Sequence, residues 1–405
     1  MAVNLSPLTT FYPVNGIKIG TVCAQIKQTQ HDDLTLFVIA EKSTCAAVFT
    51  RNAFCAAPVT IARQHLLTGA PRALLINSGN ANAGTGQQGL QNARSCCDTV
   101  AKLLDCAPTQ VLPFSTGVIG QPLPIDKICG VVATALASAN TENWENAAQA
   151  IMTTDTVPKA ASIQKIIAGK LITITGIAKG AGMIKPDMAT MLSFIATDVQ
   201  IPQSLLQISL ERAVNVSFNR ITVDSDTSTN DACVLVATGK SGLHIDKIDH
   251  PAFADFCQTL TQVCTQLAQA IIRDGEGATK FITITVEQGQ TEQECVDVAY
   301  MIAHSPLVKT AFFASDANWG RILAAVGRAP VDNLAIDAIK IYLGGVCIVE
   351  QGGVAASYTE AQGRQVMQQD EITIRVCLSR GTQQATVWTC DFSYDYVKIN
   401  AEYRT

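Results

Sequence analysis

The sequence of 405 residues has few charges and no long apolar run. Charged residues make up 16% of the chain and the formal net charge is −5. No cluster of Lys and Arg indicates binding to nucleic acid or to an anionic membrane surface. No apolar stretch has the length needed to cross a bilayer, and residues 1–16 lack the pattern of a secretory signal. We therefore expect a cytoplasmic protein with neither nucleic-acid nor membrane partners.

The chain also lacks the residue spacing of a disulfide framework or a metal site. It has fourteen cysteines but no Cys-x-x-Cys pair, and its five histidines form no pair at ligand spacing. Several cysteines, including Cys233, Cys347 and Cys377, lie inside apolar segments. Cysteine acting as a small buried hydrophobic residue in a reducing compartment explains this pattern. We predict no metal site.

Apolar periodicity predicts both strands and helices. The clearest helix lies at 253–271, where apolar residues recur every three or four positions over about five turns. Further helices are expected at 90–104, 125–137, 144–152, 292–302 and 319–326. Strands are expected at 16–26, 34–40, 46–50, 73–77, 171–177, 191–197, 281–286, 339–349, 371–378 and 385–391. Because the elements cluster instead of alternating, we expect layered sheets packed by helices, in one architecture without a domain seam.

The segment 176–191 carries the pattern with the most chemical content. Three glycines and a proline form a loop, and an apolar run that predicts a strand begins directly after Thr190. The Thr190 hydroxyl can attack the carbonyl of Ala189, and hydrolysis of the resulting ester leaves a free α-amine on Thr190. That amine, with an ordinary pKa of about 7.7–8.0, can activate the weakly nucleophilic hydroxyl. Ala-Thr is a common dipeptide, so from these residues alone a plain loop before a strand is the preferred explanation.

Seven segments in the same order resemble the self-cleaving ornithine acetyltransferase family, many of whose members are bifunctional. The likeness runs from near residue 15 to the last residue. The segments are 77–84, 115–120, 152–156, 179–183 together with 188–191, 224–231, 274–280 and 400–405.

The resemblance implies an α/β fold, a layered α/β/β/α sandwich of mixed sheets made of two self-cleaved fragments that form one body. The fragments are an alpha chain, 1–189, and a beta chain, 190–405, assembled as a heterotetramer of two alpha and two beta chains. The implied reaction passes the acetyl group of N-acetylornithine through Thr190 to glutamate, in arginine biosynthesis. No cofactor is expected, and the use of acetyl-CoA as a second acetyl donor is left open.

The resemblance also assigns roles to residues. Thr190 is the nucleophile, the Ala189–Thr190 bond is cleaved, and Thr116 with Gly117 forms the oxyanion hole. The expected substrate-binding residues are Thr153, Lys179, Thr190, Glu276, Asn400 and Thr405. Lys179 suits the α-carboxylate of the substrate and Glu276 the ammonium of ornithine. Thr153, Thr154 and Thr156 cannot be separated by sequence, and Thr153 is our choice.

Three other classes of protein compete with this interpretation. A self-cleaving amidase or aminopeptidase of the same architecture would pass the acyl group to water. A non-catalytic amino-acid-binding protein would leave the chain uncut at Thr190. Residues 84–89 spell the Gly-x-Gly-x-x-Gly of dinucleotide-binding enzymes, but they begin seven residues after Asn77 and lack the expected strand context. We interpret them as a turn and helix cap.

Overall fold

The computed structural model describes residues 2–26, 31–185 and 191–402, which fold into two compact units. The larger unit comprises Ser6–Asn219 and Asp226–Ile271, and the smaller comprises Met1–Leu5, Arg220–Ser225 and Ile272–Thr405. The expectation of an architecture without a domain seam is therefore wrong. One boundary between the units falls inside a continuous helix, α6 (Pro251–Arg273), so no linker composition marks it in the sequence.

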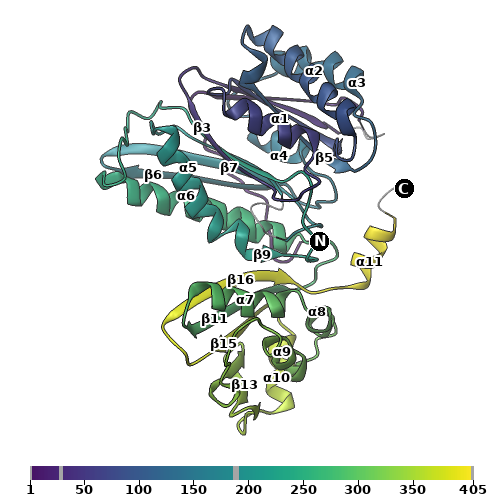
Figure 1. Cartoon of the computed structure of the whole chain (residues 1–405), viewed down its shortest axis with the longest axis vertical. Helices are drawn as coiled ribbons and strands as arrows, with labels where there is room; N and C mark the ends of the chain where they lie inside the picture. Colours follow the sequence, from purple (N-terminus) through teal and green to yellow (C-terminus); the bar gives the residue numbers. More distant parts are fainter. Residues whose placement is uncertain (1, 27–30, 186–190, 403–405) are drawn as a thin grey trace. The chain divides into compact units, whose positions relative to one another are not determined.

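The first sheet of the larger unit has four strands in the order β1-β2-β4-β5. These are β1 (Ile17–Val22), β2 (Leu34–Ile39), β4 (Ala73–Asn80) and β5 (Val111–Val118). β4 and β5 run parallel, while the other neighbours are antiparallel. Helices α2 (Gly86–Leu104) and α3 (Ile125–Ala137) cover one face, because their apolar stripes share a core cluster with Leu34, Leu36 and Leu75 (Figure 1). α1 (Ala57–Leu66) packs beside β5, and a short 3-10 helix (Pro108–Gln110) precedes that strand.

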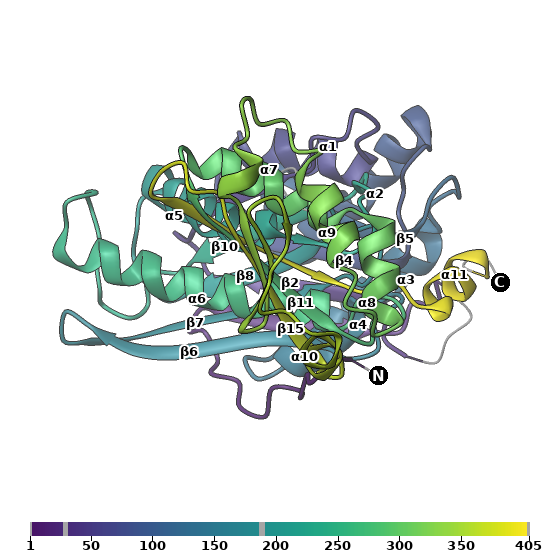
Figure 2. The same cartoon turned by 90° about the horizontal axis from the view of Figure 1, so that it is seen from below.

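The second sheet of the larger unit has five strands in the order β3-β10-β8-β7-β6. These are β3 (Thr44–Phe49), β6 (Lys159–Ile167), β7 (Lys170–Lys179), β8 (Leu192–Thr197) and β10 (Ala232–Ala237). β8 and β10 are parallel, and β6 and β7 form the long antiparallel hairpin seen in Figure 2. α5 (Gln203–Asn215) and α6 cover the outer face, where Leu267 of α6 lies against the bare backbone of Gly176 in β7.

Aromatic side chains fill the space between the two sheets. The ring of Phe37 on β2 lies 5.7 Å from Trp144 and 5.8 Å from Phe194, and Phe114 lies 5.1 Å from Phe194. Trp144 begins α4 (Trp144–Ala150), which packs into the same cluster. Inward residues on β2 and β8 alternate, as the pleat of a strand requires. Helix, sheet, sheet and helix thus form the four predicted layers, and this part of the fold prediction is confirmed.

The smaller unit contains a mixed sheet of seven strands in the order β14-β13-β12-β15-β11-β16-β9. These are β9 (Ile221–Thr222), β11 (Phe281–Gly289), β12 (Lys340–Leu343), β13 (Val346–Glu350), β14 (Gly353–Val354), β15 (Glu371–Cys377) and β16 (Gln383–Cys390). Its helices are α7 (Glu292–Ala303), α8 (Pro306–Phe313), α9 (Trp319–Val326), α10 (Glu360–Met367) and α11 (Tyr394–Ala401), with 3-10 turns at Phe218–Arg220 and Ile336–Ala338. The first four of these helices share an apolar cluster with alternate residues of β11 and β15.

Most of the elements expected from periodicity are present. The helices at 125–137 and 319–326 have the expected bounds. The single strand expected at 339–349 is wrong, because a turn divides it into the antiparallel pair β12 and β13. The elements not predicted are β5, β6, β9, β10, β14, α1, α5, α8, α10 and α11. Among the described residues, no disulfide bond joins any of the fourteen cysteines. Among the helices described, none is both long and apolar enough to span a membrane.

The core between the sheets should depend on Phe37, which is 2% exposed. We predict that Phe37→Ala lowers the free energy of unfolding by about 3–5 kcal/mol, because it removes a buried ring and leaves a cavity. Urea unfolding followed by tryptophan fluorescence measures the change. Phe54→Ala, at a position that is 80% exposed, is the matched control and should change stability by no more than about 0.5 kcal/mol. Equal effects of the two substitutions would contradict this assignment of the core.

Candidate active site

Thr116 and Gly117 lie near the end of β5, beside its parallel neighbour β4. Ser78 pairs with Thr116, and Gly79 pairs with Gly117. Gly117 has a φ of +134°, and a Cβ atom there would lie 2.3 Å from the carbonyl carbon of Gly79. Only glycine fits this backbone. The close approach of the two strands therefore requires glycine at position 117. Thr116, the residue before it, has a buried side chain.

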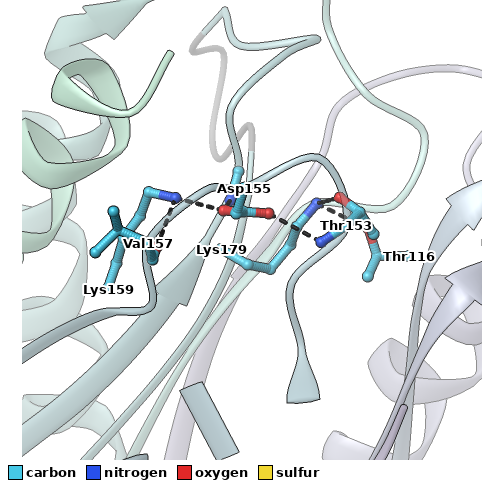
Figure 3. Close-up of polar contacts among 7 residues, drawn as sticks. Thr116, Thr153, Asp155, Val157, Lys159 and Lys179 are labelled. Carbon is cyan, nitrogen blue, oxygen red and sulfur yellow. Dashed lines mark hydrogen bonds and ion pairs between the residues drawn. The ribbon is translucent and has the colours of Figure 1, made fainter. Parts of the chain in front are cut away.

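Lys179, the last residue of β7, brings two of the predicted site residues together. Its Nζ donates hydrogen bonds to Thr116 Oγ1 at 3.1 Å and to Thr153 Oγ1 at 2.7 Å (Figure 3). All three residues belong to the larger unit, and Lys179 is only 9% exposed. Since the Thr116 oxygen accepts from an ammonium group, its own hydrogen is available to another acceptor.

The contact with Lys179 favours Thr153 among the three threonines that the sequence leaves open. Thr153 Oγ1 accepts from Lys179, and its backbone N–H donates to Asp155 Oδ2 at 3.0 Å. The binding of substrate by Thr153 remains a prediction.

Asp155 holds this cluster in place, and sequence analysis did not single it out. Its Oδ1 accepts from the backbone N–H of Gly180 at 2.7 Å and from Lys159 Nζ, an ion pair whose two side chains are fully buried (Figure 3). Burial favours the neutral acid, but the ammonium groups of Lys159 and Lys179 outweigh it and hold the pKa of Asp155 well below its ordinary value. Asp155 is therefore ionised, and its hydrogen bonds hold the backbone of Thr153 and of Gly180, the residue after Lys179, in place.

A second buried carboxyl, Asp231, lies just before β10. Burial raises its pKa well above the ordinary value, although a hydrogen bond with Ser228 and the charge of Lys179 act in the opposite direction. Its Oδ2 atom has no hydrogen-bond partner among the described residues. An unpaired buried oxygen of this kind is costly as an anion, which is the physical cause of the raised pKa of Asp231. Its place in segment 224–231 was the only signal in the sequence.

Glu276 and Asn400 form a separate pair within the smaller unit. Asn400 Nδ2 donates to Glu276 Oε2 at 2.7 Å, and Glu276 is 6% exposed. Asp391 anchors the end of the loop that carries Glu276, because it accepts hydrogen bonds from the backbone N–H groups of Thr279 and Lys280. Among the residues described, no cationic side chain pairs with Glu276. A buried carboxylate without a charge partner is suited to an ammonium ligand.

Three of the predicted site residues, Ala189, Thr190 and Thr405, lie outside the described residues. Met191, the first described residue after Thr190, accepts a hydrogen bond at its backbone carbonyl from Ala232 N at 2.9 Å. Leu192 then pairs with Lys179 across the β7–β8 ladder.

The glycines at 84–89 belong to the turn that starts α2, as interpreted from sequence. Thr85 occupies the cap position but makes no side-chain cap bond, and its hydroxyl donates to Asn82 Oδ1 instead. A Cβ atom on Gly89 would lie 1.9 Å from Thr85 Oγ1, so this glycine is needed for the tight turn. Within the described ranges, no group of three or more His, Cys, Asp or Glu side chains is arranged to hold a metal ion.

The hydroxyls of Thr116 and Thr153 both accept from the buried Lys179 ammonium, and Gly117 follows Thr116 in the chain. Such an arrangement is suited to stabilising a negative oxygen, as in enzymes that transfer acyl groups. Residues 18–405 match the ArgJ family, and the chain belongs to that family.

Two relatives are similar to this chain over almost its whole length, and one solved structure over part of it. The arginine biosynthesis bifunctional protein ArgJ of Pseudomonas fluorescens (strain Pf0-1) is 55% identical over 406 residues, covering 100% of both chains. The protein of the same name from Methylococcus capsulatus is 57% identical over 393 residues, covering 97% of this chain and 96% of its own. A crystal structure of ornithine acetyltransferase with ornithine, from Mycobacterium tuberculosis, shares 36% identity over 44% of this chain and 94% of its own, with a TM-score of 0.38.

The buried Asp155–Lys159 pair should be essential for stability. We predict that Asp155→Asn lowers the free energy of unfolding by about 3–5 kcal/mol, because it leaves the Lys159 charge buried without its partner. Since the folded pKa of Asp155 is lowered, its contribution is present above the ordinary carboxyl pKa and is lost as the pH falls below about 4. Urea unfolding at pH 7 and at several lower values measures both effects.

Glu41→Gln is the matched control, because Glu41 pairs with Arg72 while its side chain is 73% exposed. A surface pair of this kind contributes about 0–1 kcal/mol. The double variant Asp155→Asn/Lys159→Met removes both charges and should recover part of the lost stability. If Asp155→Asn were no more harmful than Glu41→Gln, the pair would not have the role described.

Proposed function

We propose that this chain transfers the acetyl group of N-acetylornithine to glutamate through an acetyl ester on Thr190. Membership of the ArgJ family and relatives named as bifunctional proteins of arginine biosynthesis support this proposal. The observation that carries it is the hydrogen bonding of Lys179 to Thr116 and Thr153 at the end of β7. This strand pairs with β8, which begins two residues after Thr190.

The first half-reaction makes the acetyl ester. The Thr190 hydroxyl attacks the acetyl carbonyl of N-acetylornithine, and the α-amine of Thr190 takes up the hydroxyl proton. The negative oxygen of the tetrahedral intermediate accepts hydrogen bonds from Thr116 Oγ1 and the Gly117 N–H, each worth about 2.7–4 kcal/mol. The C–N bond then breaks, and the proton passes from the Thr190 amine to the nitrogen of departing ornithine. Glutamate reverses these steps with its own amine and leaves as N-acetylglutamate.

The same hydroxyl makes the mature enzyme by cleaving the chain before Thr190. The attack on Ala189 converts the peptide bond to an ester, and water releases the fragments 1–189 and 190–405. The strand order of the five-stranded sheet supports their continued association. β10 and β8, from the second fragment, lie between β3 and β7 from the first. Separation would break two complete strand ladders.

As the family resemblance implies, Lys179 and Glu276 are both assigned to substrate binding. Lys179 suits the α-carboxylate and, through Thr116, the oxyanion, while Glu276 with Asn400 suits the ornithine ammonium. Thr153 and the terminal Thr405 complete the proposed substrate set. An acetyl thioester such as acetyl-CoA would acylate the same threonine, so the reaction needs no resident cofactor. We place the enzyme in the cytoplasm, as a heterotetramer of two alpha and two beta chains.

Mass spectrometry of the purified protein tests this proposal. We predict fragments of roughly 20 and 23 kDa, in proportion to their lengths in a chain of 43.0 kDa. With N-acetylornithine and no glutamate, the 190–405 fragment should gain one acetyl group, and ornithine should appear in a burst equal to the active sites. Glutamate should then remove the acetyl group as N-acetylglutamate, with the parallel initial-rate lines of ping-pong kinetics.

Thr190→Ala is the matched variant and should remain one uncut, inactive chain. Steady release of acetate and ornithine without glutamate would instead make the protein an amidase. An active wild-type chain of full length would contradict the proposal, and an inactive uncut chain that binds amino acids would indicate a binding protein.

The Glu276 assignment makes a separate prediction. Glu276→Gln keeps an oxygen for Asn400 Nδ2 but removes the negative charge. We expect kcat/KM for N-acetylornithine to fall ten- to hundredfold, because a charge-assisted hydrogen bond contributes about 1.5–3 kcal/mol. Steady-state kinetics with each substrate measures this effect, which should be smaller for glutamate.

Glu371→Gln is the control, since Glu371 forms a partly exposed ion pair with Arg273 in the same unit. It should leave both kinetic constants within about twofold. Unchanged use of N-acetylornithine by Glu276→Gln would exclude Glu276 as the ammonium ligand.

A further inference from the structure

Asn230, in the segment 224–231, contacts the strands that carry the oxyanion donors. Its side chain is 6% exposed, and its Nδ2 donates to the carbonyl of Ala81 at 2.6 Å and to that of Ser115 at 2.9 Å. Its Oδ1 accepts from Thr229 Oγ1 at 2.6 Å. Both hydrogens of one buried amide group are therefore bonded to backbone oxygens.

The two carbonyls lie next to Thr116 and Gly117. Ser115 directly precedes Thr116 in β5, and Ala81 N donates to the carbonyl of Val118, the residue after Gly117. The Asn230 amide thus bonds directly to the residue before Thr116 and, through Ala81, is connected to the residue after Gly117. A shift of this amide would shift both donors.

The same short segment also contacts the strand that follows Thr190. Ala232, two residues after Asn230, donates its N–H to the carbonyl of Met191 at 2.9 Å and then pairs with Leu192 in parallel register. Residues 230–232 therefore connect the start of β8 with the end of β5 by backbone and amide hydrogen bonds. All of these residues lie in the larger unit.

We propose that Asn230 is a positioning residue that holds the Thr116–Gly117 donors in a fixed position relative to the start of β8, at Met191. This inference rests on the proposed function. Donors of an oxyanion hole must lie about 2.7–3.1 Å from the developing anion, and a misplacement of about 1 Å can cost about a hundredfold in rate. After cleavage, Asn230 belongs to one fragment, whereas Ala81 and Ser115 belong to the other. Their hydrogen bonds then maintain without a covalent link the geometry that the transfer reaction needs.

Asn230→Asp tests the role with an almost isosteric change. An oxygen replaces Nδ2 and faces two carbonyl oxygens, so the strand ends should move apart. We expect kcat for acetyl transfer to fall at least a hundredfold, while KM for both substrates stays within about threefold. Self-cleavage, which also passes through a tetrahedral oxyanion, should slow as well.

The pH profile distinguishes positioning from a general loss of structure. A carboxyl group beside two carbonyl oxygens has a raised pKa, and its protonated form can donate one hydrogen bond. The ratio of Asn230→Asp to wild-type kcat should therefore rise as the pH falls. A constant ratio would contradict the role of the donated hydrogen bond.

Gln207→Glu is the matched control. Gln207 Nε2 donates to the carbonyl of Ala47 at 3.2 Å, and its Oε1 accepts from Ala47 N. It makes the same kind of amide-to-backbone contact between the two fragments, from α5 to β3. Gln207→Glu should leave kcat within about twofold and the thermal midpoint close to that of Asn230→Asp. An equal loss of kcat in the two variants would mean that loss of any hydrogen bond between the fragments lowers activity. The proposal would then be wrong.

Asn230→Ser provides a second variant if the aspartate variant does not fold. Its smaller side chain leaves room for water to bond the two carbonyls, so we expect about a tenfold loss of kcat with KM unchanged. Wild-type kcat in Asn230→Ser would overturn the inference. Acetylation of the wild-type 190–405 fragment is measured in the same experiment. If the wild type forms no acetyl ester, the proposed function fails; if it does and the Asn230 variants match its rate, only the positioning role fails.

Discussion

The buried carboxylate of Asp155 is the interaction on which the site in the larger unit depends. It accepts from the backbone beside Lys179 and from the backbone of Thr153, and it neutralises the buried Lys159. Loss of that charge would remove the carboxylate that interacts favourably with the ammonium groups of both Lys159 and Lys179, which is strongly unfavourable for buried charges. The hydrogen bonds of Lys179 to the two threonine hydroxyls follow from this arrangement.

Sheet pairing gives the site its second constraint. In the five-stranded sheet, β8 pairs on one side with the strand that ends at Lys179 and on the other with β10. The start of β8 therefore lies between Lys179 at the end of β7 and residues 230–232 at the start of β10. Both fragments of the proposed mature enzyme contribute strands to this one sheet, so cleavage before Thr190 breaks a covalent bond but leaves the ladders intact. A site assembled in this way keeps its geometry after cleavage.

The predictions from sequence succeeded where a pattern was local. The apolar spacing at 125–137 and 319–326 gave helices with the expected bounds, because each helix buries one stripe. β5 was missed because Pro113 and the polar Ser115–Gly117 interrupt its apolar run, although burial on both faces still makes it a strand. The boundary inside α6 left no mark, since a helix can continue from one compact unit into the next.

For the candidate site, the sequence alone determined the family and predicted which residues carry the chemistry. Ordered short motifs identify Thr116, Gly117, Lys179 and Glu276 without knowledge of their positions in space. Only the tertiary structure decided that Lys179 joins Thr116 to Thr153, that the pKa of Asp155 is lowered while that of Asp231 is raised, and that Asn230 bonds to the carbonyl of Ser115. These contacts join residues separated by up to 115 positions along the chain. Hydrogen bonds and pKa shifts depend on distance and burial, and those are set by how the strands pair, which local sequence does not encode.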